Sequence, residues 1–163
     1  MHPRRRQFLR APISAATPPR RPPNAVHEHR LALLCDACGE CVAACPTDII
    51  VLRDGLPELD FSRGECRLCG DCARACKPAA LAPADAVRLD LRARIGATCL
   101  AIRGVECRIC GDHCEAGAIR FRPARGGIRL PEIVPDACTG CGACFAPCPE
   151  AAIDIHPIME CST

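Results

Sequence analysis

The sequence predicts a small α+β protein that contains an internal duplication and is organised by groups bound to its cysteines. Three observations support this prediction. Seventeen of the 163 residues are Cys, a fraction at which cysteine chemistry usually organises a short chain. The chain has no Trp, no Tyr and only four Phe, which excludes a large aromatic core. Cysteine-rich segments alternate with short apolar arms, and this arrangement occurs twice along the chain.

Three cysteine runs share the spacing C-x2-C-x2-C-x3-C. They are Cys35, Cys38, Cys41 and Cys45; Cys66, Cys69, Cys72 and Cys76; and Cys138, Cys141, Cys144 and Cys148. This is the spacing of bacterial ferredoxins, which bind [4Fe–4S] clusters. Structural zinc sites use two separated cysteine pairs instead. Disulfides are typical of exported chains with an apolar signal segment, which residues 1–30 lack. We therefore predict that all three runs ligate [4Fe–4S] clusters.

A fourth run is incomplete. Its members are Cys107, Cys110 and Cys114, spaced C-x2-C-x3-C. Cys114 precedes Ile119 by five residues, as Cys148 precedes Ile153 in the last regular run. This register makes Cys107, Cys110 and Cys114 the second, third and fourth cysteines of a run.

The first ligand of that fourth run is missing from its regular place. The register puts it at Gly104, which has no side chain to bind iron. Cys99 is the nearest free cysteine, and the C-x7-C gap to Cys107 lets it loop in. The alternatives are His113, inside the run, and Cys161 near the C-terminus.

With Cys99 included, sixteen cysteines are enough for four clusters. In ferredoxins with two clusters, the fourth cysteine of one run ligates the cluster of the other run. That rule predicts four ligand sets. Set 1 is Cys35, Cys38, Cys41 and Cys76; set 2 is Cys66, Cys69, Cys72 and Cys45; set 3 is Cys99, Cys107, Cys110 and Cys148; set 4 is Cys138, Cys141, Cys144 and Cys114.

The segments between the runs predict two β-hairpins. The first has arms over 49–52 and 56–61 with a turn at Asp54-Gly55, and the second has arms over 119–122 and 128–134. Residues 87–95 alternate apolar and charged side chains, which favours an exposed strand. We predict a flexible Arg- and Pro-rich tail over 1–30, a first ferredoxin-like module over 31–96 and a second over 97–163.

The predicted tail is basic, with seven Arg and one Glu in residues 1–30. Its segment Arg4–Arg10 (RRRQFLR) is similar to the twin-arginine element of exported redox proteins. No apolar region follows this element, so we expect a cytoplasmic protein.

No stretch approaches the ~20 apolar residues of a membrane span. Residues 31–163 carry more acidic than basic side chains, and this charge and the lack of aromatics argue against nucleic-acid binding. The sequence has no catalytic triad, phosphate loop or nucleotide motif that would predict an enzyme.

The three regular runs, the Arg-rich start and the segment 95–123, with its long Cys99–Cys107 gap, together resemble the NapF family. These are ferredoxin-type accessory proteins of the periplasmic nitrate reductase system, and the resemblance covers essentially the whole chain. It implies a cytoplasmic protein that contacts the molybdenum-containing catalytic subunit and helps it mature before export, by assembly of its iron–sulfur cluster. The alternative is a polyferredoxin that carries electrons to a reductase. Two departures are Lys77, which precedes Pro78, and Glu115, which stands where Pro usually follows the fourth cysteine.

Overall fold

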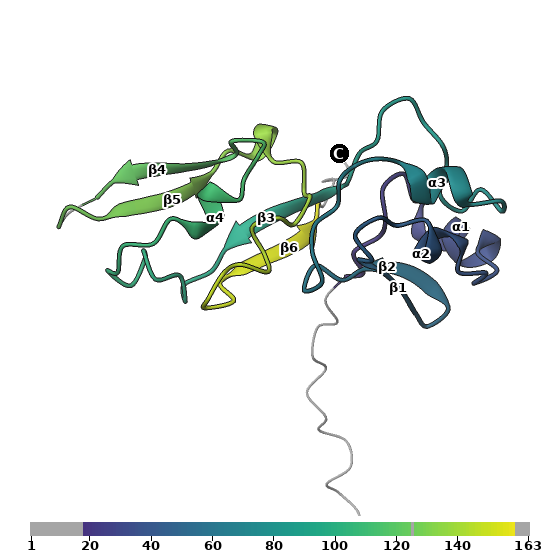
Figure 1. Cartoon of the computed structure of the whole chain (residues 1–163), viewed down its shortest axis with the longest axis horizontal. Helices are drawn as coiled ribbons and strands as arrows, with labels where there is room; N and C mark the ends of the chain where they lie inside the picture. Colours follow the sequence, from purple (N-terminus) through teal and green to yellow (C-terminus); the bar gives the residue numbers. More distant parts are fainter. Residues whose placement is uncertain (1–17, 125, 159–163) are drawn as a thin grey trace, which may run out of the picture.

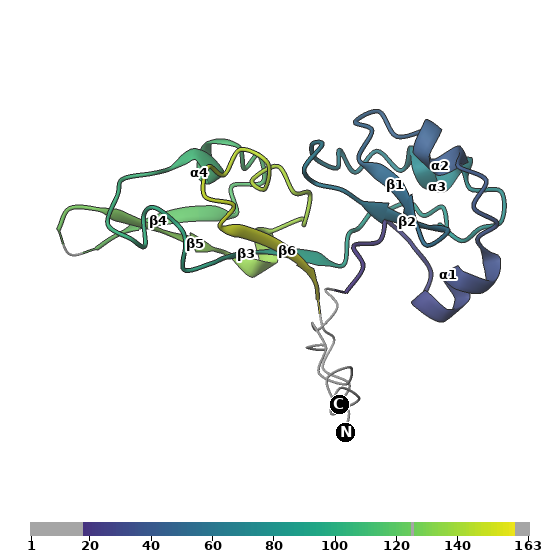
Figure 2. The same ribbon diagram turned by 90° about the horizontal axis from the view of Figure 1, so that it is seen from below.

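The computed structural model describes residues 18–124 and 126–158, which form two lobes side by side (Figure 1, Figure 2). The first lobe contains α1 (Glu28–Leu34), α2 (Glu40–Ala43), β1 (Ile50–Arg53), β2 (Leu56–Leu59) and α3 (Asp71–Ala75). The second lobe contains β3 (Leu91–Ile95), α4 (Ile109–Asp112), β4 (Ile119–Pro123), β5 (Arg129–Ile133), a 3-10 turn (Pro135–Ala137) and β6 (Ile153–Pro157). In the part of the chain so described, no helix is long and apolar enough to cross a membrane.

Both predicted hairpins are present. β1 and β2 pair antiparallel with Ile50 opposite Leu59, and β4 and β5 pair antiparallel with Ile119 opposite Ile133. The first hairpin turns at Asp54 and Gly55, which both have positive φ. Two successive left-handed residues make the turn whose twist matches paired strands, and Asp-Gly is a favoured sequence for it.

Part of the segment predicted as an exposed strand over 87–95 forms β3 (Leu91–Ile95), and only one face of β3 is exposed. β3 pairs antiparallel with β6, with Ala93 opposite Ile155, and Leu91, Ala93 and Ile155 are buried. The alternating pattern therefore marks one face that packs against the core and one that meets solvent. β3 lies before the module boundary predicted at residues 96 and 97, yet it pairs with the last strand of the second lobe.

Residues 18–30 differ from the flexible tail expected over 1–30. The Arg20 side chain donates a 2.7 Å hydrogen bond to the Ile155 carbonyl and forms a 3.0 Å ion pair with Asp154. Ala25 bridges to Leu81, and α1 begins at Glu28. These contacts join residues more than fifty positions apart, so local composition did not reveal them. The rest of the predicted tail, with the twin-arginine-like element, lies outside the described residues.

The two lobes meet at a small apolar contact. The Phe61 side chain is fully buried, and its ring centroid lies 6.4 Å from that of Phe145 in the second lobe. Beside it, the Cys66 N–H donates a 2.8 Å hydrogen bond to the Cys141 carbonyl. This contact brings one regular cysteine run of each lobe to the lobe boundary.

Candidate iron–sulfur sites

The third cysteine of every run is the buried one. Cys41, Cys72, Cys110 and Cys144 are buried, whereas the second cysteines Cys38 and Cys69 are exposed. The first three of the four buried residues lie in α2, α3 and α4. Because Cys110 shares the burial of the other third cysteines, the structure gives the incomplete run the same register that the sequence suggests.

Set 1 surrounds one cavity in the first lobe. Cys35, Cys38, Cys41 and Cys76 all line this cavity. Burial raises the pKa of the Cys41 thiol to about 11, and the charges of the Cys35, Cys76 and Cys38 thiolates add to the rise. Three cysteines of the first run therefore lie with the fourth cysteine of the second run.

Set 2 surrounds a second cavity of the same lobe, lined by Cys45, Cys66, Cys69 and Cys72. Burial raises the pKa of the Cys72 thiol to about 12, and nearby Cys66, Cys45 and Cys69 thiolates contribute to the rise. The exchange of fourth cysteines between the two runs is thus reciprocal in this lobe.

Set 4 repeats this arrangement in the second lobe. Cys114, Cys138, Cys141 and Cys144 line one cavity. Burial raises the pKa of the Cys144 thiol to about 12, with further contributions from Cys141, Cys138 and then Cys110. Cys114 comes from the incomplete run, so that run supplies its fourth cysteine as the regular runs do.

Set 3 is brought together by the long gap before Cys107. Burial raises the pKa of the Cys110 thiol to about 11, and the thiolates that add to the rise are those of Cys99, Cys107 and Cys148. Two turn hydrogen bonds fold the gap, from Arg103 N–H to the Cys99 carbonyl and from Val105 N–H to the Leu100 carbonyl.

Of the two alternative ligands for set 3, the structure describes only His113. His113 is exposed and ends α4. Cys161 lies outside the described residues. Cys99 is therefore the candidate that the structure brings beside the other three cysteines of the set.

Backbone amides point at the fourth cysteine of three runs. The N–H groups of Leu81, Ala118 and Ala152 each donate a 3.3 Å hydrogen bond to the Sγ of Cys76, Cys114 and Cys148, respectively. The donor stands four residues after Cys114 and Cys148 but five after Cys76. The run in which Lys77 precedes Pro78 therefore keeps this hydrogen bond, with a donor one residue further along the chain. In the run where Glu115 replaces Pro, the donor remains the fourth residue after the cysteine.

The fourth cysteine of the first run has a different donor group. Burial opposes ionisation of Cys45, but hydrogen bonding from the Thr47 side chain and from the amides of Thr47, Ile49 and Ile50 outweighs it and lowers the pKa of the thiol. Thr47 Oγ1 lies 3.6 Å from Cys45 Sγ. Hydrogen bonds to thiolate sulfur favour the charged form that binds metal.

One backbone turn recurs after each fourth cysteine, and sequence reasoning did not find it. The residue three places on has positive φ in every run, namely Asp48, Ala79, Gly117 and Ala151. Its N–H donates to the carbonyl of the fourth cysteine in each case. Only one of these residues is Gly, so composition gave no signal for the turn. The turn directs the following amides toward sulfur.

The donor chemistry of the four sets fits an iron–sulfur cluster. Among residues 18–124 and 126–158, no three His, Cys, Asp or Glu side chains converge as they would on a single metal ion. In sets 1, 2 and 4 the four thiols instead surround a cavity, which suits a group of several atoms. Fe–S clusters are held by four Cys thiolates, and binding displaces the protons that burial keeps on these thiols. The role of each cysteine as a ligand stays a prediction.

The comparisons with known proteins agree with this chemistry. A family described as a 4Fe–4S dicluster domain matches residues 34–80 and 104–152. The chain is 39% identical to the ferredoxin-type protein NapF of Haemophilus influenzae, with 96% of this chain and 95% of that protein covered. It is 39% identical to NapF of Escherichia coli, with 82% of each covered. It is 36% identical to the methylamine utilization ferredoxin-type protein MauM of Methylophilus methylotrophus, over 84% of this chain and 70% of that protein.

The dicluster matches define the chain as a ferredoxin-type iron–sulfur protein that carries 4Fe–4S clusters. Within that class, it belongs to the NapF family of ferredoxin-type proteins. The second dicluster match begins at residue 104, so Cys99 lies outside the matched residues.

Proposed function

We propose that the chain holds four [4Fe–4S] clusters in two modules and acts as an accessory protein of the periplasmic nitrate reductase system. In this proposal it binds the molybdenum-containing catalytic subunit in the cytoplasm, before export, and assists its maturation by iron–sulfur cluster assembly. Its role is that of a non-enzymatic partner.

The grouping of the cysteines carries this proposal. In sets 1, 2 and 4, cysteines of two different runs line one cavity, with Cys76, Cys45 and Cys114 as the fourth members, and the proposal extends this exchange to Cys148 in set 3. The exposed Cys38 and Cys69 leave sets 1 and 2 accessible from solvent, as a protein that presents clusters to a partner requires. Membership in the NapF family supports the choice of partner.

The cluster count is tested by anaerobic reconstitution. We expect about 16 iron and about 16 sulfide per chain, because four thiolate sets each hold one [4Fe–4S] group. Chemical iron and sulfide analysis, together with the visible absorbance of the reconstituted protein, measures this. A protein that binds zinc at about four per chain and shows no visible absorbance would contradict the cluster assignment.

The partner is tested with a deletion that respects the fold. Removing residues 1–17 takes away four Arg, Arg4, Arg5, Arg6 and Arg10, but keeps Arg20, the Ala25–Leu81 bridge and α1. We expect unchanged iron content and roughly tenfold weaker capture of the purified catalytic subunit, because charged surface contacts steer association. Titration in a pull-down at low salt measures the loss.

The matched control changes charge and keeps length. Replacing those four Arg with Gln should weaken capture as much as the deletion does, whereas deletion of residues 1–30 should also lower stability, because it removes contacts of the folded body. If the deletion of residues 1–17 leaves capture unchanged, the twin-arginine-like element does not take part in binding the catalytic subunit.

A second candidate function, electron transfer to a reductase, is favoured by a separate observation. Sets 2 and 4 meet where Cys66 and Cys141 are hydrogen-bonded across the lobe boundary. A protein that only assembles or presents clusters has no need for contact between sets of different lobes.

A further inference from the structure

The contact between the lobes joins two ligand sets through one hydrogen bond. Cys66 belongs to set 2 and Cys141 to set 4, and the Cys66 N–H lies 2.8 Å from the Cys141 carbonyl oxygen. Cys66 and Cys141 also line the same cleft at the lobe boundary.

Within each lobe, the two sets are joined by short pieces of chain. Cys41 of set 1 and Cys45 of set 2 are four residues apart across α2, and Cys72 and Cys76 are related in the same way by α3. In the second lobe, Cys110 of set 3 and Cys114 of set 4 are likewise four residues apart, at α4. The two sets of each lobe are therefore joined by at least one short piece of chain.

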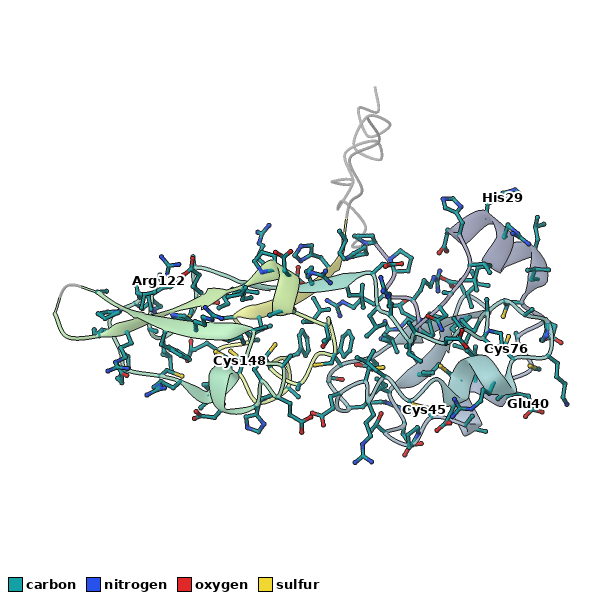
Figure 3. All side chains as sticks on the ribbon, turned by 90° about the horizontal axis from the view of Figure 1, so that it is seen from above. His29, Glu40, Cys45, Cys76, Arg122 and Cys148 are labelled. Carbon is teal, nitrogen blue, oxygen red and sulfur yellow. The ribbon has the colours of Figure 1, made fainter. Side chains whose placement is uncertain are left out.

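In the first lobe, set 2 lies on the side of the second lobe. In Figure 3, Cys45 of set 2 lies nearer to the second lobe than Cys76 of set 1 does. Sets 2 and 4 both line a cleft at the lobe boundary, through Cys66 on one side and Cys141 on the other. Sets 1 and 3 contribute no cysteine to this cleft.

We propose that the four sets form a single electron path in the order 1, 2, 4, 3, which crosses between the lobes at the Cys66–Cys141 hydrogen bond. This inference rests on the four clusters of the proposed function. It makes sets 1 and 3 the two ends of the path, where external partners exchange electrons.

The crossing step moves one electron and no proton. With clusters bound, set 2 would hold the one-electron donor of this step and set 4 its acceptor. A low-potential one-electron donor would supply the electron at one end of the path, and an oxidised one-electron partner would accept it at the other. The shortest covalent and hydrogen-bonded route runs from Cys66 Sγ through Cβ, Cα and N–H. It then passes to the Cys141 carbonyl and along Cα and Cβ to Cys141 Sγ.

Other contacts hold this crossing in place. Phe61 and Phe145 pack across the boundary, and the Arg20 guanidinium lies 5.5 Å from the Phe145 ring centroid. Arg20 is also tied to Ile155 and Asp154 of the second lobe. The relative position of Cys66 and Cys141 is therefore fixed by packing as well as by their own hydrogen bond.

The order is tested by electron paramagnetic resonance of two full-length variants. One lacks sets 1 and 3 through Cys35→Ser, Cys38→Ser, Cys99→Ser and Cys107→Ser. The other lacks sets 2 and 4 through Cys69→Ser, Cys72→Ser, Cys138→Ser and Cys144→Ser. Each keeps two sets and should bind about eight iron. After full reduction with dithionite, we expect a split spectrum from the variant that keeps sets 2 and 4. The variant that keeps sets 1 and 3 should give two simple, non-interacting signals.

Two results would overturn the proposal. One is a simple spectrum from the variant that keeps sets 2 and 4, and the other is a split spectrum from the variant that keeps sets 1 and 3. If either variant fails to bind about eight iron, removal of set 2 alone provides the second test. It should leave set 1 as an isolated, uncoupled signal, whereas removal of set 1 alone should leave every remaining signal coupled; the reverse pattern contradicts the order. An iron shortfall in the unmodified protein would count against the four-cluster proposal itself.

Discussion

Cys99→Ala is expected to remove one cluster, so that iron falls from about 16 to about 12 per reconstituted chain. The Cys99 thiolate is the first of the neighbouring charges that act on the buried Cys110 thiol, and the folded loop after Cys99 holds it beside Cys107 and Cys148. Alanine leaves set 3 with three thiolates. Iron and sulfide analysis, with the electron paramagnetic resonance spectrum of the reduced protein, measures the loss. A [3Fe–4S] signal in place of one [4Fe–4S] signal would identify Cys99 as a ligand equally well.

Two matched controls separate Cys99 from the alternatives. His113→Ala and Cys161→Ala are both expected to keep about 16 iron, because His113 is exposed at the end of α4 and the four sets are complete without Cys161. If His113→Ala costs iron and Cys99→Ala does not, set 3 has an imidazole ligand and the register of the fourth run is wrong.

The hairpins and the register of the cysteine runs were predictable because their determinants are local. The turn at Asp54-Gly55 requires two left-handed residues, and the sequence offers a pair that adopts them easily. The register of the incomplete run followed from the spacing of Cys114 and Ile119, and the structure buries Cys110 as it buries Cys144.

The parts that could not be predicted depend on contacts between distant residues. Arg20 and Asp154 are separated by 134 positions, and no local pattern in the Pro-rich segment 18–23 indicates that pair. The pairing of β3 with β6 and the Cys66–Cys141 hydrogen bond are equally non-local. Composition alone therefore assigned residues 18–30 to a tail and left the order of the clusters undetermined.

A smaller difference concerns the residue that follows the second cysteine. In the regular runs it is Gly39, Gly70 or Gly142, each with positive φ, whereas in the incomplete run it is Arg108, with φ of −132°. A left-handed residue favours Gly, so the regular runs need Gly there and the incomplete run does not. The Arg108 guanidinium lies 5.1 Å from the Phe121 ring centroid, so a cation–π contact joins the incomplete run to β4.

Gly142→Ala is expected to lower the stability of the reconstituted protein by about 2–5 kcal/mol. Gly142 has φ of +82°, where a side chain costs about 1–2 kcal/mol. A Cβ at this position would also overlap the Phe61 ring of the first lobe, and overpacking of this kind costs about 1–3 kcal/mol more. Because Phe61 is fully buried, its ring has little space to move. Urea unfolding of the reconstituted protein under anaerobic conditions, followed by circular dichroism, measures the change in midpoint.

Gly39→Ala is the matched control, because Gly39 occupies the equivalent place after Cys38 and has φ of +79°. A Cβ there has no neighbour within 4 Å, so only the backbone cost of about 1–2 kcal/mol applies. The difference between the two variants therefore isolates the contact between the lobes. Gly142→Ala should also weaken the spin interaction between sets 2 and 4, since it pushes Phe61 away from the residue next to Cys141, while Gly39→Ala should not. Equal midpoints in the two variants would mean that Phe61 does not occupy the space beside Gly142.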